Sequence, residues 1–441
     1  MVSLTAPVSR WIGRRLLTRA ASSGGVDLSR ISVVPKAFKV PFQREGLDPR
    51  VRVGARRERP PVSRLMHVFG LNVWLVTGYP EARAVLADTT SYSNDIRPMV
   101  ASAGSTPVHS IGGLGFTDPP VHTRLRGLLT PEFTKRRLAR LQPRIEQIVH
   151  HQLDVAQEAG EVSDLVRAFA FPVPFQVICE LLGVPLEERE EFRAMGAARF
   201  DLSQGGAGLF GAASKSREFL FQVVAEQRAE PGDGLIGALI RDHGDELEDV
   251  DLAGLADGVF LGGYETSASM LALGTLVLTQ HPEALELARR GGAELDAVVE
   301  ELLRYLGVVQ TAFPRFARYD LELFGHEVRR GDVVLVSLSG ANRDERLASG
   351  AVRFDPTREP GSHLAFGHGF HRCVGSELAR MELRTAFRAI AERFPDVELA
   401  CSPDDLTFRE LSVVYGIESL PVRLRPAQPR SAVDAPSRQQ L

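Results

Sequence analysis

The residues best suited to chemistry lie in one glycine-rich stretch, AFGHGFHRCVG, at positions 365–375. It contains Cys373, one of only three cysteines in the chain, and the helical pattern SELARMELRTAFRAIAERF follows at once. Cys373 therefore precedes a helix N-terminus, where free amide N–H groups and the helix dipole favour a thiolate. Because a thiolate is a strong, soft ligand for iron, the loop predicts that Cys373 binds haem iron.

Two other interpretations of this loop stay open. Cys373 could be a buried structural cysteine in a glycine turn, or it could form a zinc site with three histidines of the same stretch, His363, His368 and His371. Structural zinc sites usually draw paired ligands from two segments, and the sequence offers no second cluster. The pattern therefore favours iron over zinc.

Composition restricts the class of protein. The chain has 441 residues, 44% of them hydrophobic and 24% charged, and no long linker divides its middle, which indicates one large domain. A net charge of −4 gives no reason to expect nucleic acid as a partner. Three cysteines are few for a chain of this length, and an odd number cannot all be paired, which argues against a disulfide framework. We therefore expect a cytoplasmic protein.

The elements that must position the loop are mainly helical. A long helix is predicted from about residue 251 to 280 and another over 293–306, and Asp118-Pro119 are expected to cap and start a third. Strand patterns are fewer and lie at 72–78, within 315–338 and at 420–424. The expected fold class is mainly α with a small β portion.

The pattern F-G-x-G-x-H-x-C-x-G resembles the haem-binding signature of the cytochrome P-450 family, in its soluble bacterial branch. The resemblance extends from about Val62 to Leu424. It implies haem b with Cys373 as axial ligand, a long central helix over the haem and the cysteine loop beneath it. The other signature residues present are Phe366, Gly367, Gly369, His371 and Gly375.

A second match is Glu301-Leu302-Leu303-Arg304, in which Glu301 and Arg304 share a helix face. Alone, such a pair is usually a solvated surface pair of little energetic value. It resembles the family's E-x-x-R motif, whose third member the resemblance places at Arg358. The implied role of the three residues is structural.

A third match is the stretch from Gly262 to Thr266 in the long helix. Glycines cost about 1 kcal/mol each in a helix interior, so a notch for helix packing is the simpler explanation. The stretch nevertheless resembles the family's A-G-x-[D/E]-T motif. That resemblance implies that Glu265 and Thr266 are catalytic and route protons to the dioxygen bound above the haem.

A fourth match concerns the haem propionates, for which arginine is the best forked partner. His122 and Arg126 are four residues apart on a predicted helix, and DPPVHTRLR resembles the family's D-P-P-x-H-x-x-x-R pattern. The resemblance implies that His122, Arg126, Arg315 and His371 hold the propionates.

The predicted domains are an N-terminal extension at 1–45, a single catalytic domain at 46–425 and a disordered tail at 426–441. The extension contains a basic amphipathic pattern, RWIGRRLLTR, with no acidic residue before Asp27. Contact of this pattern with a membrane surface or a partner is one interpretation. We favour an appended helix or a mobile tail.

The family resemblance implies an oxidoreductase that inserts one oxygen atom from O2 into a sizeable apolar substrate, such as a polyketide or macrolide, a terpenoid or a steroid-like molecule. No nucleotide-binding G-x-G-x-x-G follows a strand, so we expect electrons from a separate ferredoxin and ferredoxin reductase. A basic cluster is expected to steer an acidic ferredoxin: Arg126, Lys135, Arg136, Arg137, Arg140 and Arg372. The alternatives are a peroxygenase that uses peroxide and a non-catalytic haem or ligand-binding protein.

Overall fold

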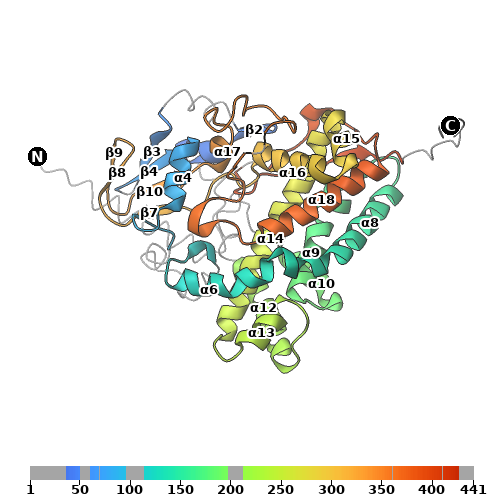
Figure 1. Ribbon diagram of the computed structural model, residues 1–441, viewed down its shortest axis with the longest axis horizontal. Helices are drawn as coiled ribbons and strands as arrows, with labels where there is room; N and C mark the ends of the chain where they lie inside the picture. Colours follow the sequence, from blue (N-terminus) through green and yellow to red (C-terminus); the bar gives the residue numbers. More distant parts are fainter. Residues whose placement is uncertain are drawn as a thin grey trace, which may run out of the picture.

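The computed structural model describes residues 36–49, 60–68, 70–95, 114–196, 212–359, 361–409 and 411–426. Helices dominate, and they form the broad body in Figure 1, while a small β region lies at its side. The helices are α2 (Lys36–Lys39), α4 (Tyr79–Ala87), α6 (Val121–Leu129), α7 (Lys135–Leu138), α8 (Gln142–Glu158), α9 (Pro172–Leu182), α10 (Arg189–Gly196), α12 (Ala212–Ala229), α13 (Leu235–His243), α14 (Asp249–Gln280), α15 (Pro282–Arg290), α16 (Gly292–Leu306), α17 (Leu338–Ala341) and α18 (Ser376–Arg393).

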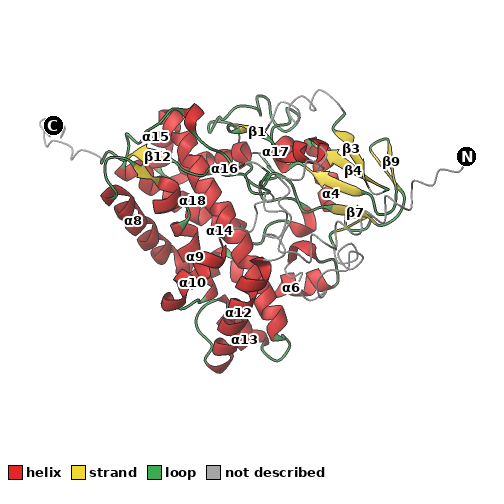
Figure 2. Cartoon of the chain, turned by 180° about the vertical axis from the view of Figure 1, so that it is seen from behind, coloured by secondary structure: helices red, strands yellow, loops and turns green. Residues whose placement is uncertain are grey.

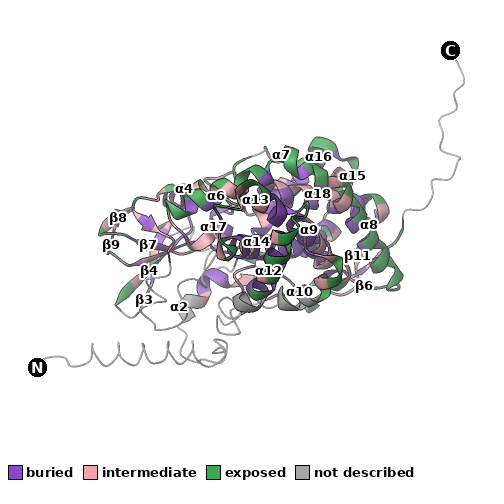
Figure 3. Cartoon of the chain, turned by 90° about the horizontal axis from the view of Figure 1, so that it is seen from below, coloured by how far each residue is buried: buried purple, intermediate pink, exposed green. Residues whose placement is uncertain are grey.

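Helix α14 is the axis of the helical body. Its 32 residues are apolar around most of the circumference, and α9, α12, α16 and α18 pack against it. A helix that is apolar on all sides must be covered on all sides. Figure 3 shows this arrangement, with buried residues gathered along α14 and exposed residues on outer helices such as α8.

The β region is built around a five-stranded sheet in the order β3-β4-β10-β7-β5. Figure 2 shows β3, β4 and β7 together at one end of the molecule. Its strands are β3 (Val62–Val68), β4 (Leu71–Val76), β5 (Tyr92–Ser93), β7 (Arg315–Ala317) and β10 (Val333–Val336). β10 pairs parallel with β4, from Val333 opposite Val73 to Val336 opposite Val76, and antiparallel with β7. Arg315 is the first residue of β7 and lies opposite Val334 of β10, so the sheet fixes the position of Arg315.

Three smaller sheets complete the β portion. They pair β1 (Arg44–Glu45) with β2 (Asp48–Pro49), β8 (Leu321–Leu323) with β9 (His326–Val328), and β12 (Pro421–Arg423) with both β11 (Glu398–Leu399) and β6 (Ser163–Asp164). The β8–β9 hairpin turns at Gly325, whose φ is +83°.

The predicted fold class, mainly α with a small β portion, is confirmed, and so are the long helix and the strand regions. The predicted helix start at Asp118-Pro119 is wrong, because α6 begins at Val121 and has no side-chain cap. The Asp118 carboxylate instead accepts hydrogen bonds from Ser93, from the Asn94 amide and from Arg318. It is therefore used in tertiary contacts, which local sequence does not reveal.

The predicted terminal segments lie largely outside the described residues. The basic pattern RWIGRRLLTR and nearly all of the predicted tail fall there, and only residues 36–45 of the predicted extension are described. Within them, Val40 and Phe42 are buried. Throughout the described ranges, no helix is both long and apolar enough to span a membrane.

Candidate active site

The cysteine loop is fixed against α4 by a glycine. Gly369 has a φ of +69°, and a Cβ atom there would lie 2.7 Å from both Ala87 Cα and Leu86 O. Only glycine accepts that conformation and that approach without strain. The Cys373 amide then donates to Phe366 O at 2.9 Å, which closes the loop just before α18. The loop geometry thus follows from its glycines.

The Cys373 thiol is surrounded by protein and yet keeps accessible surface. Such a side chain faces an internal space. Burial raises the pKa of the Cys373 thiol, while a hydrogen bond from the Gly375 amide and the charges of Arg126 and Arg372 oppose that rise. The same donors would stabilise a thiolate bound to a metal.

Helix α14 presents an open stripe within the core. Gly258, Gly262 and Thr266 are four residues apart and keep accessible surface, whereas most residues of this helix are buried. A Cβ atom on Gly262 would meet nothing within 4 Å, but one on Gly263 would lie 2.5 Å from Ile178 of α9. Of the two glycines, only Gly263 is therefore a packing notch, and Gly262 borders open space.

The hydroxyl of Thr266 lies on this stripe and donates to Gly262 O at 2.5 Å. Such a bond to the preceding turn satisfies the hydroxyl and loosens the helix locally. Glu265 is the residue before Thr266, about 100° round the helix, and its side chain is buried. Arg409 Nη1 donates to Glu265 Oε1 at 2.8 Å, so the acid forms an ion pair away from the open stripe.

Basic side chains from three segments converge beside the cysteine loop. The rings of His122 and His371 lie 4.3 Å apart, and Arg126 and Arg315 are close enough to act on His371 electrostatically. Burial and these neighbouring charges lower the pKa of His371 to about 3, and that of His122 to about 4. Burial also lowers the pKa of Arg315 to about 10.

In the described ranges, Asp118 is the carboxylate whose charge acts on His122, Arg315 and His371 of this cluster. Among the described residues, neither ring nitrogen of the buried His122 has a hydrogen-bond partner. Arg315 is buried as well, and its Nη1 donates to a carbonyl, Phe313 O, at 3.0 Å. Buried cations are usually paired. A site with these basic residues, a cysteine and an open stripe of α14 suits a group that carries two carboxylates and binds a thiolate. Haem is such a group.

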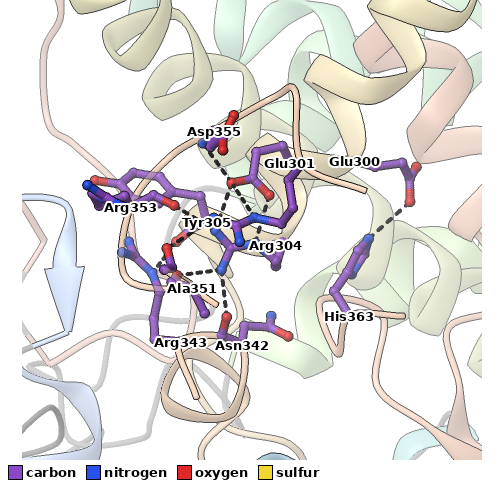
Figure 4. Close-up of polar contacts among 12 residues, drawn as sticks. Glu300, Glu301, Arg304, Tyr305, Asn342, Arg343, Ala351, Arg353, Asp355 and His363 are labelled. Atoms are coloured by element: carbon purple, nitrogen blue, oxygen red, sulfur yellow. Dashed lines mark hydrogen bonds and ion pairs between the residues drawn. The ribbon is translucent and has the colours of Figure 1, made fainter. Parts of the chain in front are cut away.

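Glu301 and Arg304 of α16 form a buried, bidentate ion pair with two N–O distances of 2.7 Å (Figure 4). Arg304 also donates to three carbonyls of the segment before the cysteine loop, those of Asn342, Ala351 and Arg353. Arg358 lies farther away, with Nε 3.7 Å from Glu301 Oε1. The pair thus anchors residues 342–353 to α16.

The residues of the zinc alternative do not converge. His363 Nε2 contacts Glu300 Oε2 at 3.0 Å, and Arg380 pairs with the same carboxylate. Within the described part of the chain, no group of three or more His, Cys, Asp or Glu side chains could hold a metal ion. The structure therefore gives this alternative no support.

Two residues of this region were missed by the sequence analysis. Arg409 pairs with Glu265 across 144 positions, and Glu382 of α18 is buried against α14, where Ser267 hydrogen-bonds it. Neither belongs to a short motif, and a pairing over such a separation leaves no local signal in one sequence.

Comparison with known proteins gives a consistent result. Residues 294–413 match the family model described as Cytochrome P450. The chain is 39% identical to Cytochrome P450 165B3 of Amycolatopsis orientalis, over 86% of this chain and 97% of the relative. It is 38% identical to 6-deoxyerythronolide B hydroxylase of Saccharopolyspora erythraea, over 83% of this chain and 94% of that protein.

Solved structures agree with the sequence relatives. The crystal structure of Orf6* (CYP165D3), a monooxygenase involved in teicoplanin biosynthesis, superposes with a TM-score of 0.77 at 36% identity, covering 87% of this chain and all of that one. OxyC, implicated in an oxidative C–C coupling reaction during vancomycin biosynthesis, gives 0.78 at 35% identity, covering 88% and 96%. The arrangement of helices around α14 is thus shared with these enzymes.

Proposed function

Since this chain belongs to the cytochrome P450 family and is a haem monooxygenase, we propose that Cys373 is the thiolate that binds the iron of its haem b. The observation that carries this assignment is the setting of the Cys373 thiol. It faces an internal space at the N-terminus of α18 and accepts a hydrogen bond from the Gly375 amide. The other cysteines lack such a setting, since Cys179 is buried in the helical core and Cys401 lies beyond α18.

The four basic residues His122, Arg126, Arg315 and His371 hold the haem propionates in this proposal. Burial is the main cause of the lowered pKa values, about 4 for His122 and about 3 for His371; neighbouring basic groups add to the shift and Asp118 opposes it. Two carboxylates would reverse that balance. Phe366 and Gly367 shape the loop under the ring, and Glu301, Arg304 and Arg358 keep their proposed structural role.

When bound, haem supplies the activation of O2 and the transfer of one oxygen atom to substrate. The chain supplies orientation and protons. Thr266 places its hydroxyl on the open stripe of α14, and Glu265, one residue before it, is the acid proposed to feed that hydroxyl. Residues 46–425 form the catalytic domain in this proposal, and a cytoplasmic location stays a prediction.

The substrate is proposed to be a sizeable apolar molecule, in the first place a polyketide or macrolide. Supporting this, residues 114–116 contact α14, and the ring of the well-exposed Phe313 meets that of Phe116 edge-on at 4.7 Å. Relatives include 6-deoxyerythronolide B hydroxylase and enzymes of glycopeptide antibiotic biosynthesis. Terpenoid and steroid-like substrates remain within the same proposal.

Electrons are proposed to come from a ferredoxin and its reductase. Helix α7 lies beside the cysteine loop, because Lys135 Nζ is 3.5 Å from Glu377 Oε2 in the first turn of α18 and Phe133 packs near Gly375. Support for the predicted basic cluster thus comes from its α7 members, Lys135, Arg136 and Arg137, although Arg137 is already paired with Glu132. Such a surface suits an acidic partner in a small, transient contact.

Turnover of 6-deoxyerythronolide B with labelled O2, NADPH and a surrogate ferredoxin and reductase tests the proposal. We expect one labelled oxygen atom in the product and a shift of the haem band on binding. Product formed with hydrogen peroxide alone, and none with the ferredoxin system, would favour the peroxygenase alternative. No turnover of any macrolide, terpenoid or steroid tested would contradict the substrate class.

A further inference from the structure

A guanidinium from the N-terminal part of the chain caps helix α16. Arg44 of β1 donates through Nη1 to Leu306 O at 2.6 Å and through Nη2 to Gly307 O at 2.7 Å. Carbonyls at a helix C-terminus lack partners within the helix, and the negative end of the helix dipole favours a cation there. Arg44 therefore fixes the point at which the chain leaves α16.

The guanidinium of Arg44 is also held from two further sides. Its Nε donates to Gln310 Oε1 at 3.0 Å, and its Cζ lies 4.5 Å over the ring of Tyr415. Burial lowers the pKa of Arg44 to about 9, whereas the nearby Tyr415 and Asp48 oppose that shift. A solvated surface arginine has no such set of partners, so this side chain has one fixed position.

The side chain of Gln310 extends these contacts to a third segment. Gln310 is 1% exposed, and its Nε2 donates to Phe42 O at 3.1 Å and to Ser412 O at 2.8 Å. Its backbone amide donates to Val413 O at 3.0 Å. Because Oε1 accepts from Arg44, both ends of the Gln310 amide group are used. Gln310 thus joins the N-terminal segment, the segment after α16 and the segment that contains Ser412.

The segment that Gln310 holds runs directly into the candidate active site. Val309 forms an antiparallel bridge with Val414, which ties the segment to its neighbour. Phe313 follows, with its exposed ring against Phe116, and Arg315 of the basic cluster comes two residues later. The positions of Phe313 and Arg315 therefore depend on the path that the chain takes after α16.

Resting on the proposed function, we propose that Arg44 is a positioning residue for substrate, which acts through Gln310 and holds segment 308–313 in the path that a large ligand requires. Without Arg44 this segment populates other paths as well. A ligand that touches the segment then binds only the competent fraction, and its apparent affinity falls by that fraction. A ligand too small to touch the segment is unaffected.

Two azoles of different size test this role in the haem-loaded full chain. Imidazole and clotrimazole both bind haem iron through a ring nitrogen and shift the Soret band, but clotrimazole also carries a bulky triaryl group. In Arg44→Gln we expect clotrimazole to bind about fivefold more weakly relative to imidazole, a change typical of residues that act on a site from outside it. Arg44→Lys keeps the charge and loses the fork, so it should move the ratio in the same direction. It serves as the second variant if Arg44→Gln does not fold.

Leu153→Ala is the control for a general loss of stability. Leu153 of α8 is fully buried in the helical core, so its truncation lowers the thermal midpoint. The ratio of the two azole affinities should nevertheless stay at the wild-type value. An equal change of the ratio in Leu153→Ala and Arg44→Gln would overturn the proposal, because the effect would then follow stability alone.

Gln310→Leu tests the route by which Arg44 acts. It should weaken clotrimazole relative to imidazole, and adding Arg44→Gln to it should change the ratio far less than Arg44→Gln does alone, since the two side chains work as one unit. Full additivity of the two substitutions, or an unchanged ratio in both Arg44 variants, would overturn the proposal.

The spectrum under carbon monoxide separates this test from the proposed function. A red-shifted Soret band in the reduced wild type and in the Arg44 variants, together with an unchanged azole ratio, would refute the role of Arg44 and leave the proposed function intact. A wild type without that band would refute the function itself.

Discussion

Glu382 offers a test in which the structure fixes both sign and size. Its side chain is buried between α18 and α14, one oxygen is hydrogen-bonded by Ser267, and Oε2 has no partner among the described residues. Burial raises the pKa of Glu382 from the ordinary 4.5 to about 8. The folded protein therefore binds this proton more tightly than the unfolded chain does.

The consequence is a loss of stability with rising pH. Between pH 4.5 and 8 the unfolded chain releases the proton of Glu382 and the folded protein keeps it, so the free energy of unfolding falls as pH rises. Each pH unit is worth about 1.4 kcal/mol, so Glu382 lowers the free energy of unfolding by about 3 kcal/mol at pH 7 relative to acid pH. Glu382→Gln replaces the neutral carboxyl by a neutral amide and removes this dependence.

The assay compares unfolding of haem-loaded wild type and Glu382→Gln at several pH values from 5 to 8. The difference in stability should move in favour of the variant by about 1.4 kcal/mol per pH unit. A constant offset from the altered hydrogen bonding does not affect that slope. Glu392→Gln, on the exposed face of the same helix, is the matched control and should show no slope. A flat difference for Glu382→Gln would refute the reasoning.

Three further predictions concern the scaffold and the partner surface. Glu301→Gln leaves the buried Arg304 uncompensated and should lower the free energy of unfolding by about 3–5 kcal/mol. Glu286→Gln, which breaks an exposed pair, should have little effect, and similar losses in the two variants would contradict the anchoring role. Gly369→Ala should lower both the thermal midpoint and haem retention, because the added Cβ meets the backbone of α4. Gly46 also has a positive φ, but a Cβ atom there would meet nothing within 4 Å, so Gly46→Ala measures the backbone strain without the steric clash. Equal losses of thermal midpoint in the two variants would show that the clash with α4 is unimportant. Arg136→Glu should slow the reduction of the haem by an acidic ferredoxin and weaken the dependence of that rate on ionic strength. Arg330→Glu, near β9, is the control. An unchanged salt dependence in Arg136→Glu would exclude steering by this face.

Much of the scaffold could be predicted from sequence because its signals are local. The long apolar run of α14 indicates a buried helix by itself, and the glycines of the cysteine loop mark a backbone that only glycine adopts. Asp118 was assigned wrongly for the opposite reason, since its carboxylate binds side chains from distant segments in place of a helix end. Pairing over long separations likewise hid Arg409.

The candidate site divides in the same way. Residues within one motif could be identified by type and spacing, as with Glu265 and Thr266. The direction of each side chain could not, because adjacent helix positions point about 100° apart and tertiary contacts decide which one faces a partner. Only the structure shows that Glu265 is paired with Arg409 while Thr266 lies on the open stripe.

The most direct test of the central claim is the visible spectrum of the dithionite-reduced, haem-loaded protein under carbon monoxide, recorded beside that of Cys373→His. If Cys373 is the thiolate ligand, the wild type shows a strongly red-shifted Soret band and the variant lacks it. An unshifted band in the wild type, or the same red-shifted band in both proteins, would contradict ligation by Cys373.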